Sequence, residues 1–428
     1  MSQLRGLTAN LRAAIVARLA EREGARSRTT TPGRDFATLP LVREMEMVRA
    51  GAEEMGIPNP FFRPHDGVAG GHSRIAGREV INFSSYNYLG LNGDPRVAEA
   101  AKQAIDRYGI SASASRIASG ERPVHAALER ALAEHYQTEA ALCFVSGHAT
   151  NVTVIGCLMG SRDLIVADAL SHNSAAEGMR LSGARRISFA HNDWREAERE
   201  LAAHRRRYGR CLIYIEGHYS MDGDMPDLAQ FVRLAREYDA WLMVDEAHSL
   251  GVLGATGRGV FEQQGVDPAG VDIWMGTLSK TLSACGGYIA GNATLIEMLK
   301  HYAPGFVYSV GMAPSLAAAA LRSLEILHEE PWRVQRLQAN ARLFLEGARA
   351  RGFDCGHSCG LGIVPVILGR SSRAGQVAAK LFEMGVNVQP ILYPIVPEGS
   401  ARLRFFISSE HSEEDITTAL EALSAACA

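Results

Sequence analysis

The sequence has few cysteines, little net charge and no long apolar run. Its start carries no segment suited to a signal peptide or a spanning helix, so we expect a cytoplasmic protein without a membrane span. The seven cysteines have no paired spacing, which argues against a disulfide framework. A net charge of −3 indicates neither nucleic-acid binding nor membrane adsorption. The hydrophobic content of 47% is ordinary for a globular enzyme.

No metal site and no nucleotide loop are expected. Residues 355–359 read Cys-Gly-His-Ser-Cys, but no second pair of ligands accompanies them, and structural zinc needs four. The glycine-rich string 254–259 lacks the Gly-Lys-Ser/Thr ending and the strand-to-helix context of a phosphate loop. We therefore interpret both segments as loops.

From about residue 80 onward, short apolar strands alternate with longer helical patterns. This alternation predicts an α/β fold whose mostly parallel sheet is covered on both faces. From residue 353 onward, strands and helices mix, which predicts a smaller C-terminal α+β domain. We expect an N-terminal arm and helix over 1–75, a large domain over 76–305 and a small domain over 306–428. The expected strands are 140–145, 164–167, 186–190, 211–216, 241–245, 271–276 and 287–290, and the expected helices are 96–108, 124–136, 149–159, 228–238 and 315–328.

The first 34 residues form a basic arm. Apolar residues recur at helical spacing from Leu4 to about Glu23, among several arginines, which predicts an amphipathic helix. Two interpretations stay open: the helix packs on a neighbouring subunit, or it meets an acidic partner.

Two expected strands end in residues that carry chemistry. Asp245 and His248 follow one apolar run, and Lys280 follows another. The carboxyl ends of parallel strands form the ligand crevice of such folds. A lysine there can condense with a carbonyl, which is Schiff-base chemistry. Asp245 would need a cationic partner at a buried strand end, or would cap a helix. Residues 146–151 follow another strand and open a helix, a setting that suits a phosphate.

These residues, together with segments 83–91, 216–224 and 401–404, resemble the α-oxoamine synthases, and the similarity runs from about residue 55 to 425. That family includes 8-amino-7-oxononanoate synthase, serine palmitoyltransferase, 5-aminolevulinate synthase and glycine C-acetyltransferase. The resemblance implies the fold of type I pyridoxal 5'-phosphate (PLP) transferases, PLP as cofactor, and a homodimer with sites at the interface.

The resemblance also assigns roles around the PLP ring. Lys280 corresponds to the Schiff-base lysine and later general base, and Asp245 to the acid that pairs with the pyridine nitrogen. His248 and Ser220 correspond to residues that reach the phenolic oxygen, and His172 to the histidine that stacks on the ring. The residues expected to hold the phosphate are Ser146, Gly147, His148, Thr277, Ser279 and, from the neighbouring subunit, Ser309. His148 stands where an aromatic residue is commoner, so its backbone N–H is the expected donor.

Three residues are expected to meet the substrates. Arg404 matches the arginine that holds the amino-acid carboxylate, a task that suits a bidentate guanidinium. We expect Arg402, the competing candidate, to point to the opposite face of its strand. Asn87 resembles an asparagine near the substrate pocket, and Ser113 lies in the loop 110–120, where many family members are glycine-rich. We expect its side chains to narrow the space near the acyl donor.

The expected reaction is a decarboxylating Claisen condensation. A small α-amino acid (glycine, alanine or serine) and an acyl thioester would give an α-amino ketone, carbon dioxide and a free thiol. The loop 110–120 is similar to that of oxoamine synthase domains of polyketide assembly lines, so an acyl-carrier protein competes with acyl-CoA as donor. Carrier proteins are acidic, and the basic arm could meet one. The alternatives are transamination and a non-catalytic partner subunit, although such subunits lack the lysine.

Overall fold

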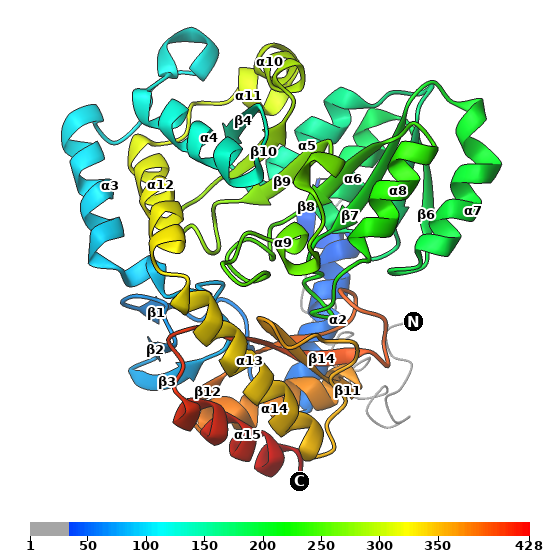
Figure 1. The fold of residues 1–428 in the computed structure, drawn as a ribbon. Coiled ribbons are helices and arrows are strands. Elements are labelled where there is room, and N and C mark those ends of the chain that lie inside the picture. The colour runs from blue at the N-terminus through cyan, green and yellow to red at the C-terminus, as the bar shows by residue number, and fades with distance from the viewer. Residues whose placement is uncertain (1–33) are drawn as a thin grey trace.

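The computed structural model describes residues 34–428. A large α/β part lies above a smaller part that holds the C-terminus (Figure 1). The large part is built on a seven-stranded sheet of order β4-β10-β9-β8-β7-β5-β6, in which only the pairs made by β10 are antiparallel. Its strands are β4 Ala140–Phe144, β5 Leu164–Asp168, β6 Arg185–Phe189, β7 Cys211–Glu216, β8 Trp241–Asp245, β9 Ile273–Thr277 and β10 Gly287–Gly291.

Helices cover both faces of this sheet. Along β7, Leu212 and Tyr214 belong to one core cluster, while Ile213 and Ile215 belong to the other. Because β7 is buried on both faces, its sequence is a continuous apolar run without alternation. One cluster is completed by α5, α6, α10 and α11, and the other mainly by α4, α8, α12 and α13. The helices are α2 Pro40–Glu54, α3 Pro95–Tyr108, α4 Pro123–Tyr136, α5 Gly147–Leu158, α6 Asn173–Ser182, α7 Trp194–His204, α8 Leu228–Glu237, α9 Val260–Gln264, α10 Ala293–Tyr302, α11 Pro304–Val307, α12 Pro314–Glu329, α13 Trp332–Ala350, α14 Ser371–Glu383 and α15 Glu413–Cys427.

The smaller part contains two further sheets. One is antiparallel, of order β11-β14-β13, and the other has the order β1-β2-β3-β12. Val386 of β12 pairs with Ile81 of β3 in parallel, so the segment before the large sheet lies beside the C-terminal part of the chain. The strands are β1 His65–Asp66, β2 His72–Ile75, β3 Arg78–Asn82, β11 Ile363–Gly369, β12 Val386–Asn387, β13 Gln389–Ile391 and β14 Ala401–Phe406.

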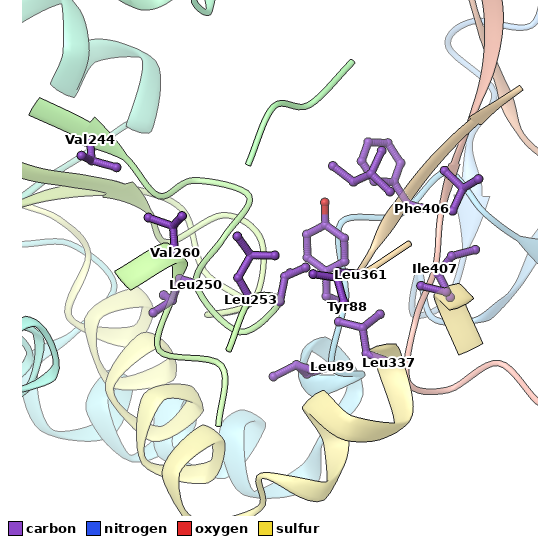
Figure 2. Packing of buried hydrophobic residues seen from close by; sticks show 14 of the residues in the cluster. Tyr88, Leu89, Val244, Leu250, Leu253, Val260, Leu337, Leu361, Phe406 and Ile407 are labelled. Atoms are coloured by element: carbon purple, nitrogen blue, oxygen red, sulfur yellow. The ribbon is translucent and has the colours of Figure 1, made fainter. Parts of the chain in front are cut away.

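One apolar core joins the two parts. It includes Leu250 and Leu253 from the loop after β8, Tyr88 from the segment after β3, Leu337 of α13 and Phe406 of β14. Figure 2 shows these side chains gathered between the loop after β8 and the small-part strands. The loop after β8, the segment after β3, α13 and β14 are far apart in sequence but are closely packed in this core.

The expected elements of the large part are present, with bounds that differ by one or two residues. The sequence did not single out α6 or α7. These short helices connect β5 to β6 and β6 to β7 along the chain. The expected helix of the basic arm lies outside the described residues. Among residues 34–428, no helix combines the length and apolar character needed to cross a membrane.

Candidate active site

The expected site residues gather at one edge of the large sheet. β8 ends at Asp245 and β9 at Thr277, and the turn after β9 carries Lys280. A cavity of about 330 Å³ opens beside them, lined by Lys280, Ser279, Tyr86 and Asn87 among others. The segment after β3 thus closes one side of the site.

Asp245 is buried and held by three donors. Its Oδ2 accepts from the side-chain amide of Asn151 at 2.8 Å and from the hydroxyl of Tyr214 at 2.9 Å. Its Oδ1 accepts from the backbone N–H of Ala247 at 2.9 Å. All three contacts are donors, and a carboxylate oxygen is an acceptor, so the hydrogen bonds fix the orientation of the Asp245 side chain. The carboxylate is therefore a fixed negative charge at the strand end.

Lys280 is half-buried, and its Nζ lies 5.6 Å from the ring centre of Tyr86. Burial lowers the pKa of its amine to about 8, although the nearby carboxylates of Asp245 and Glu216 oppose the shift. An amine with this pKa is partly neutral near pH 7, as a nucleophile or a general base requires. The position fits the expected role.

His172 is the N-cap of α6 and is held from two sides. Its Nδ1 lies 2.7 Å from the hydroxyl of Ser174 and accepts from the Ser174 backbone N–H at 3.2 Å. Its own backbone N–H donates to the buried carboxylate of Glu216 at 2.6 Å. Burial lowers the pKa of the imidazole, so the ring is neutral at pH 7.

His248 is buried against aromatic rings. Its Nδ1 lies 2.8 Å from the hydroxyl of Tyr88, and its ring stacks on Phe406 with an interplanar angle of 9°. Burial, with Lys280 and Arg404 nearby, holds the imidazole pKa well below its usual value. His248 is thus a neutral hydrogen-bonding group rather than a cation.

The start of α5 and the turn after β9 form a small polar cup. Ser146 caps the helix by accepting from the Ala149 N–H at 3.3 Å. A Cβ on Gly147 would lie 2.7 Å from Oγ1 of Thr277, so these two residues are in close contact. The hydroxyl of Thr277 donates to that of Ser279 at 3.2 Å. Hydroxyl groups and free helix N–H groups in this arrangement suit a phosphate.

The other expected phosphate residues have less defined surroundings. The His148 side chain is exposed, but it lies close enough to His172 to contribute to the lowered pKa of the His172 imidazole. Ser309 is half-buried just after α11. Their roles stay predictions.

The expectation that Arg402 points away from Arg404 is wrong. Residues two apart along a strand share a face, and both guanidinium groups reach the segment 220–222. Arg402 donates to the carboxylate of Asp222 at 2.7 Å, which occupies it. Arg404 donates to the carbonyl of Ser220 at 3.0 Å and to a methionine sulfur, and it also interacts with the hydroxyl of Tyr86, but its buried Nε has no partner among the described residues. Arg404 is therefore the arginine with free donors for an anion, but for a reason other than strand alternation.

Asn87 and Ser113 differ in their surroundings. Asn87 is buried at the cavity wall, and its side-chain oxygen accepts from the Asn92 N–H at 3.1 Å. Ser113 is exposed, has a φ of 58°, and does not line this cavity. A positive φ favours glycine, which agrees with the glycine-rich loop of the resembled family.

Sequence reasoning missed the residues that hold the site residues in place. Asn151, Ser174, Tyr214 and Glu216 all contact Asp245 or His172 from other elements. Local patterns gave little signal for them, because their segments read as ordinary helix or buried strand. Glu216 offered one signal, since a carboxylate that ends a fully buried strand needs a partner.

The residues present fit PLP. Asp245 offers an anion for a ring cation, Lys280 an amine for an aldehyde, and the cup at Gly147 and Thr277 a place for a phosphate. By contrast, residues 34–428 contain no cluster of three side chains able to hold a metal, and their seven cysteines are free.

Comparisons with known proteins agree with this arrangement. The family described as "Aminotransferase class I and II" matches residues 78–423. The 8-amino-7-oxononanoate synthase of Thermoanaerobacter pseudethanolicus is 41% identical over 354 residues, which cover 83% of this chain and 89% of that protein. Its namesake from Symbiobacterium thermophilum is 43% identical over 350 residues, with 82% and 89% covered.

The same relationship holds for solved structures. A structure of serine palmitoyltransferase with PLP matches with a TM-score of 0.86 and 31% identity, covering 92% of this chain and 98% of that one. Fold and sequence thus agree over most of the described residues. The chain belongs to the class I and II aminotransferase family and, within it, to the α-oxoamine synthases.

Proposed function

We propose that this enzyme condenses a small α-amino acid (glycine, alanine or serine) with an acyl thioester and releases carbon dioxide and a free thiol. Membership of the α-oxoamine synthases makes it a PLP-dependent acyltransferase. The observation that carries the proposal is that Asp245 and Arg404 both lie close enough to Lys280 for their charges to act on the pKa of its amine. In the name of the relatives, 8-amino-7-oxononanoate synthase, the amino carbon adjoins the oxo carbon. That is the α-amino ketone arrangement which this condensation produces.

PLP, when bound, supplies an electron sink for the negative charge that forms at the α-carbon. The Asp245 carboxylate is oriented by the three donors around it, and its negative charge favours a protonated ring nitrogen. His248, held by Tyr88, and Ser220 are the proposed partners of the phenolic oxygen. The cup at Ser146, Gly147 and Thr277, with Ser279 and the His148 N–H, is the proposed phosphate site.

The protein groups act on the amino acid as follows. Arg404 holds the substrate carboxylate through its free donors, and its buried setting strengthens the ion pair. The neutral amine of Lys280 takes the proton from the α-carbon and returns a proton after carbon dioxide has left. His172 lies near Asp245, Lys280 and Arg404, and no hydrogen bond of its Nε2 is seen among residues 34–428. Asn87 lines the same cavity as Lys280 and is the proposed contact of the substrate there.

The acyl donor is a further part of the proposal. The loop 110–120 is anchored by Arg116, which pairs with Glu121 at 2.6 Å and with Glu129. Its tip at Ser113 is exposed. An anchored loop with an exposed tip can be contacted by a protein that docks on the surface. This supports an acyl-carrier protein as the donor, rather than an acyl-CoA that a flexible glycine-rich loop would enclose.

We also propose that the enzyme works as a homodimer in the cytoplasm. The loop 110–120 and the segment after α11 are joined by a hydrogen bond from the Gly311 N–H to the Ala114 carbonyl, at 2.9 Å. Around this junction Ile110 is 73% exposed and Tyr308 is 87% exposed. Apolar groups that are this exposed support a subunit interface. A partner seated there would bring Ser309 toward the neighbouring site.

Product analysis tests the function. The enzyme is incubated with PLP and glycine, alanine or serine, each with acyl-CoA and with acyl-carrier donors, and the products are identified by mass spectrometry. An α-amino ketone with equal amounts of carbon dioxide and thiol is expected. Transfer of the amino group to a keto acid would instead identify an aminotransferase. Lys280→Ala should abolish turnover and covalent PLP, whereas Lys102→Ala, on the exposed side of α3, should not.

A further inference from the structure

A network of hydrogen bonds connects two residues of the candidate site, Asp245 and His172. The side-chain amide of Asn151 donates to Oδ2 of Asp245 at 2.8 Å and to the hydroxyl of Ser174 at 3.0 Å. That hydroxyl lies 2.7 Å from Nδ1 of His172. Asn151 and Ser174 are both buried, with exposures of 1% each. The network therefore runs through the protein interior, where water does not compete for these bonds.

The direction of each hydrogen bond follows from its fixed members. Asp245 accepts from a tyrosine and a backbone N–H, so its carboxylate requires the NH₂ side of the Asn151 amide. The second N–H of that amide points at the Ser174 oxygen. The Ser174 hydroxyl hydrogen is then free for His172. The Asp245 carboxylate thus sets the donor and acceptor direction of each hydrogen bond from Asn151 to His172.

Two donors, the hydroxyl and the backbone N–H of Ser174, act together on Nδ1 of His172. The N–H of Ser174 points at Nδ1 from 3.2 Å, and a backbone N–H is always a donor. Nδ1 must therefore be the unprotonated nitrogen, because two hydrogens cannot share that contact. The ring is neutral, since burial lowers its pKa. Its one hydrogen is then on Nε2.

We propose that Asn151 and Ser174 are positioning residues that fix His172 as the Nε2–H tautomer. This deepens the proposed function, on which its catalytic consequence rests. With Nε2–H toward the site, His172 donates a hydrogen bond to an anionic oxygen of the substrate, such as the carboxylate or the oxygen formed at the acyl carbon. In this tautomer Nε2 is not a base, so the proton at the α-carbon is left to Lys280.

The imidazole nitrogens report the tautomer directly. The full-length protein, freed of PLP and labelled with ¹⁵N-histidine, is measured by NMR, with the His172 signals assigned by their loss in His172→Gln. We expect an acceptor-type Nδ1 and a protonated Nε2 in the unmodified protein. Ser174→Ala removes the closer of the two donors at Nδ1, and Asn151→Leu removes the amide that orients that donor. In both variants the Nδ1–H tautomer should therefore become detectable and both nitrogen signals should shift, while the backbone N–H of Ser174 remains. Ser174→Thr, which keeps the hydroxyl, should preserve the pattern.

Kinetics with PLP add a second readout. Ser174→Ala should lower kcat/KM for the amino acid about tenfold, the size expected for one buried hydrogen bond. Ser182→Ala, at the other end of α6, should change neither the signals nor the rate, and circular dichroism shows whether each variant folds. A protonated Nδ1 in the unmodified protein, or unchanged signals in both variants, overturns the proposal. If the signals behave as expected but no condensation occurs, the tautomer assignment stands and the proposed function falls.

Discussion

The hydroxyl of Tyr88 lies 2.8 Å from Nδ1 of His248, although 160 residues separate the two in the chain. Both side chains are buried, and both contact Phe406 of the small part. This bond therefore ties the segment after β3 to the loop after β8, at the point where the two parts of the molecule meet. Because Nδ1 is occupied by Tyr88, Nε2 is the nitrogen of His248 that can bind a group in the site.

Replacing this tyrosine should affect activity and stability together. Tyr88→Phe keeps the ring packing but leaves Nδ1 of His248 buried without a partner, which costs about 1–2 kcal/mol. We expect a lower unfolding free energy by that amount and a reduced kcat. Chemical denaturation and steady-state kinetics measure the two effects. Tyr238→Phe, at the end of α8 and away from the site, is the matched control, and equal behaviour of the two variants would contradict the assigned role.

Attachment of PLP should depend on pH through Lys280. Its amine has a pKa of about 8, and only the neutral amine attacks an aldehyde. The attachment rate should therefore rise with pH up to about 8 and level off above it, whereas an exposed lysine would titrate near 10.4. Absorbance after mixing the PLP-free protein with PLP follows the reaction. A rate that still climbs steeply at pH 10 would exclude a lowered pKa.

The glycine at the start of α5 should be needed for the phosphate. In Gly147→Ala the new Cβ would lie 2.7 Å from Oγ1 of Thr277, so the polar cup must distort. We expect the Kd for PLP to rise about tenfold or more, equivalent to roughly 1.4 kcal/mol. Gly156→Ala on the same helix meets only the flexible side chain of Leu181 at 3.3 Å and serves as control. Equilibrium titration with PLP compares them, and similar affinities would argue against a phosphate at this turn.

His191 should stabilise the fold in a pH-dependent way. It lies 3.0 Å from carboxylate oxygens of both Asp168 and Asp224. Burial lowers its pKa, but the two hydrogen-bonded carboxylates outweigh this and raise it to about 10. Because the folded pKa exceeds the unfolded value near 6.5, the stabilisation is complete below pH 6.5 and disappears as the pH rises toward 10.

The variant His191→Gln measures this contribution. It leaves two carboxylates without a cation, so we expect a loss of about 3 kcal/mol at pH 6 and a smaller loss at pH 9. Urea denaturation at several pH values gives the comparison. His204→Gln removes only a partly exposed pair with Glu200, which should cost less than about 0.5 kcal/mol. A His191 effect that does not vary with pH would show that the histidine is not charged.

Part of the site could be predicted because its residues follow recognisable strands. Asp245 and Lys280 come directly after apolar runs, and such runs form buried strands whose carboxyl ends meet at one edge. The faces of Arg402 and Arg404 should have been predictable from their spacing as well. The two arginines differ in their partners: Arg402 binds the carboxylate of Asp222, which lies 180 residues away in the sequence.

Local patterns were enough to predict the alternation of strands and helices, the family resemblance, and the lysine and the acid at the strand ends. These features depend on apolar runs and motifs, which can be recognised without knowledge of contacts. The side chains that orient the lysine and the acid are known only from the three-dimensional packing. Asn151 meets Asp245 across 94 residues, and Tyr88 meets His248 across 160. Such pairs depend on strand order and on the packing of the two parts, so the protonation and orientation of the site are properties of the folded chain.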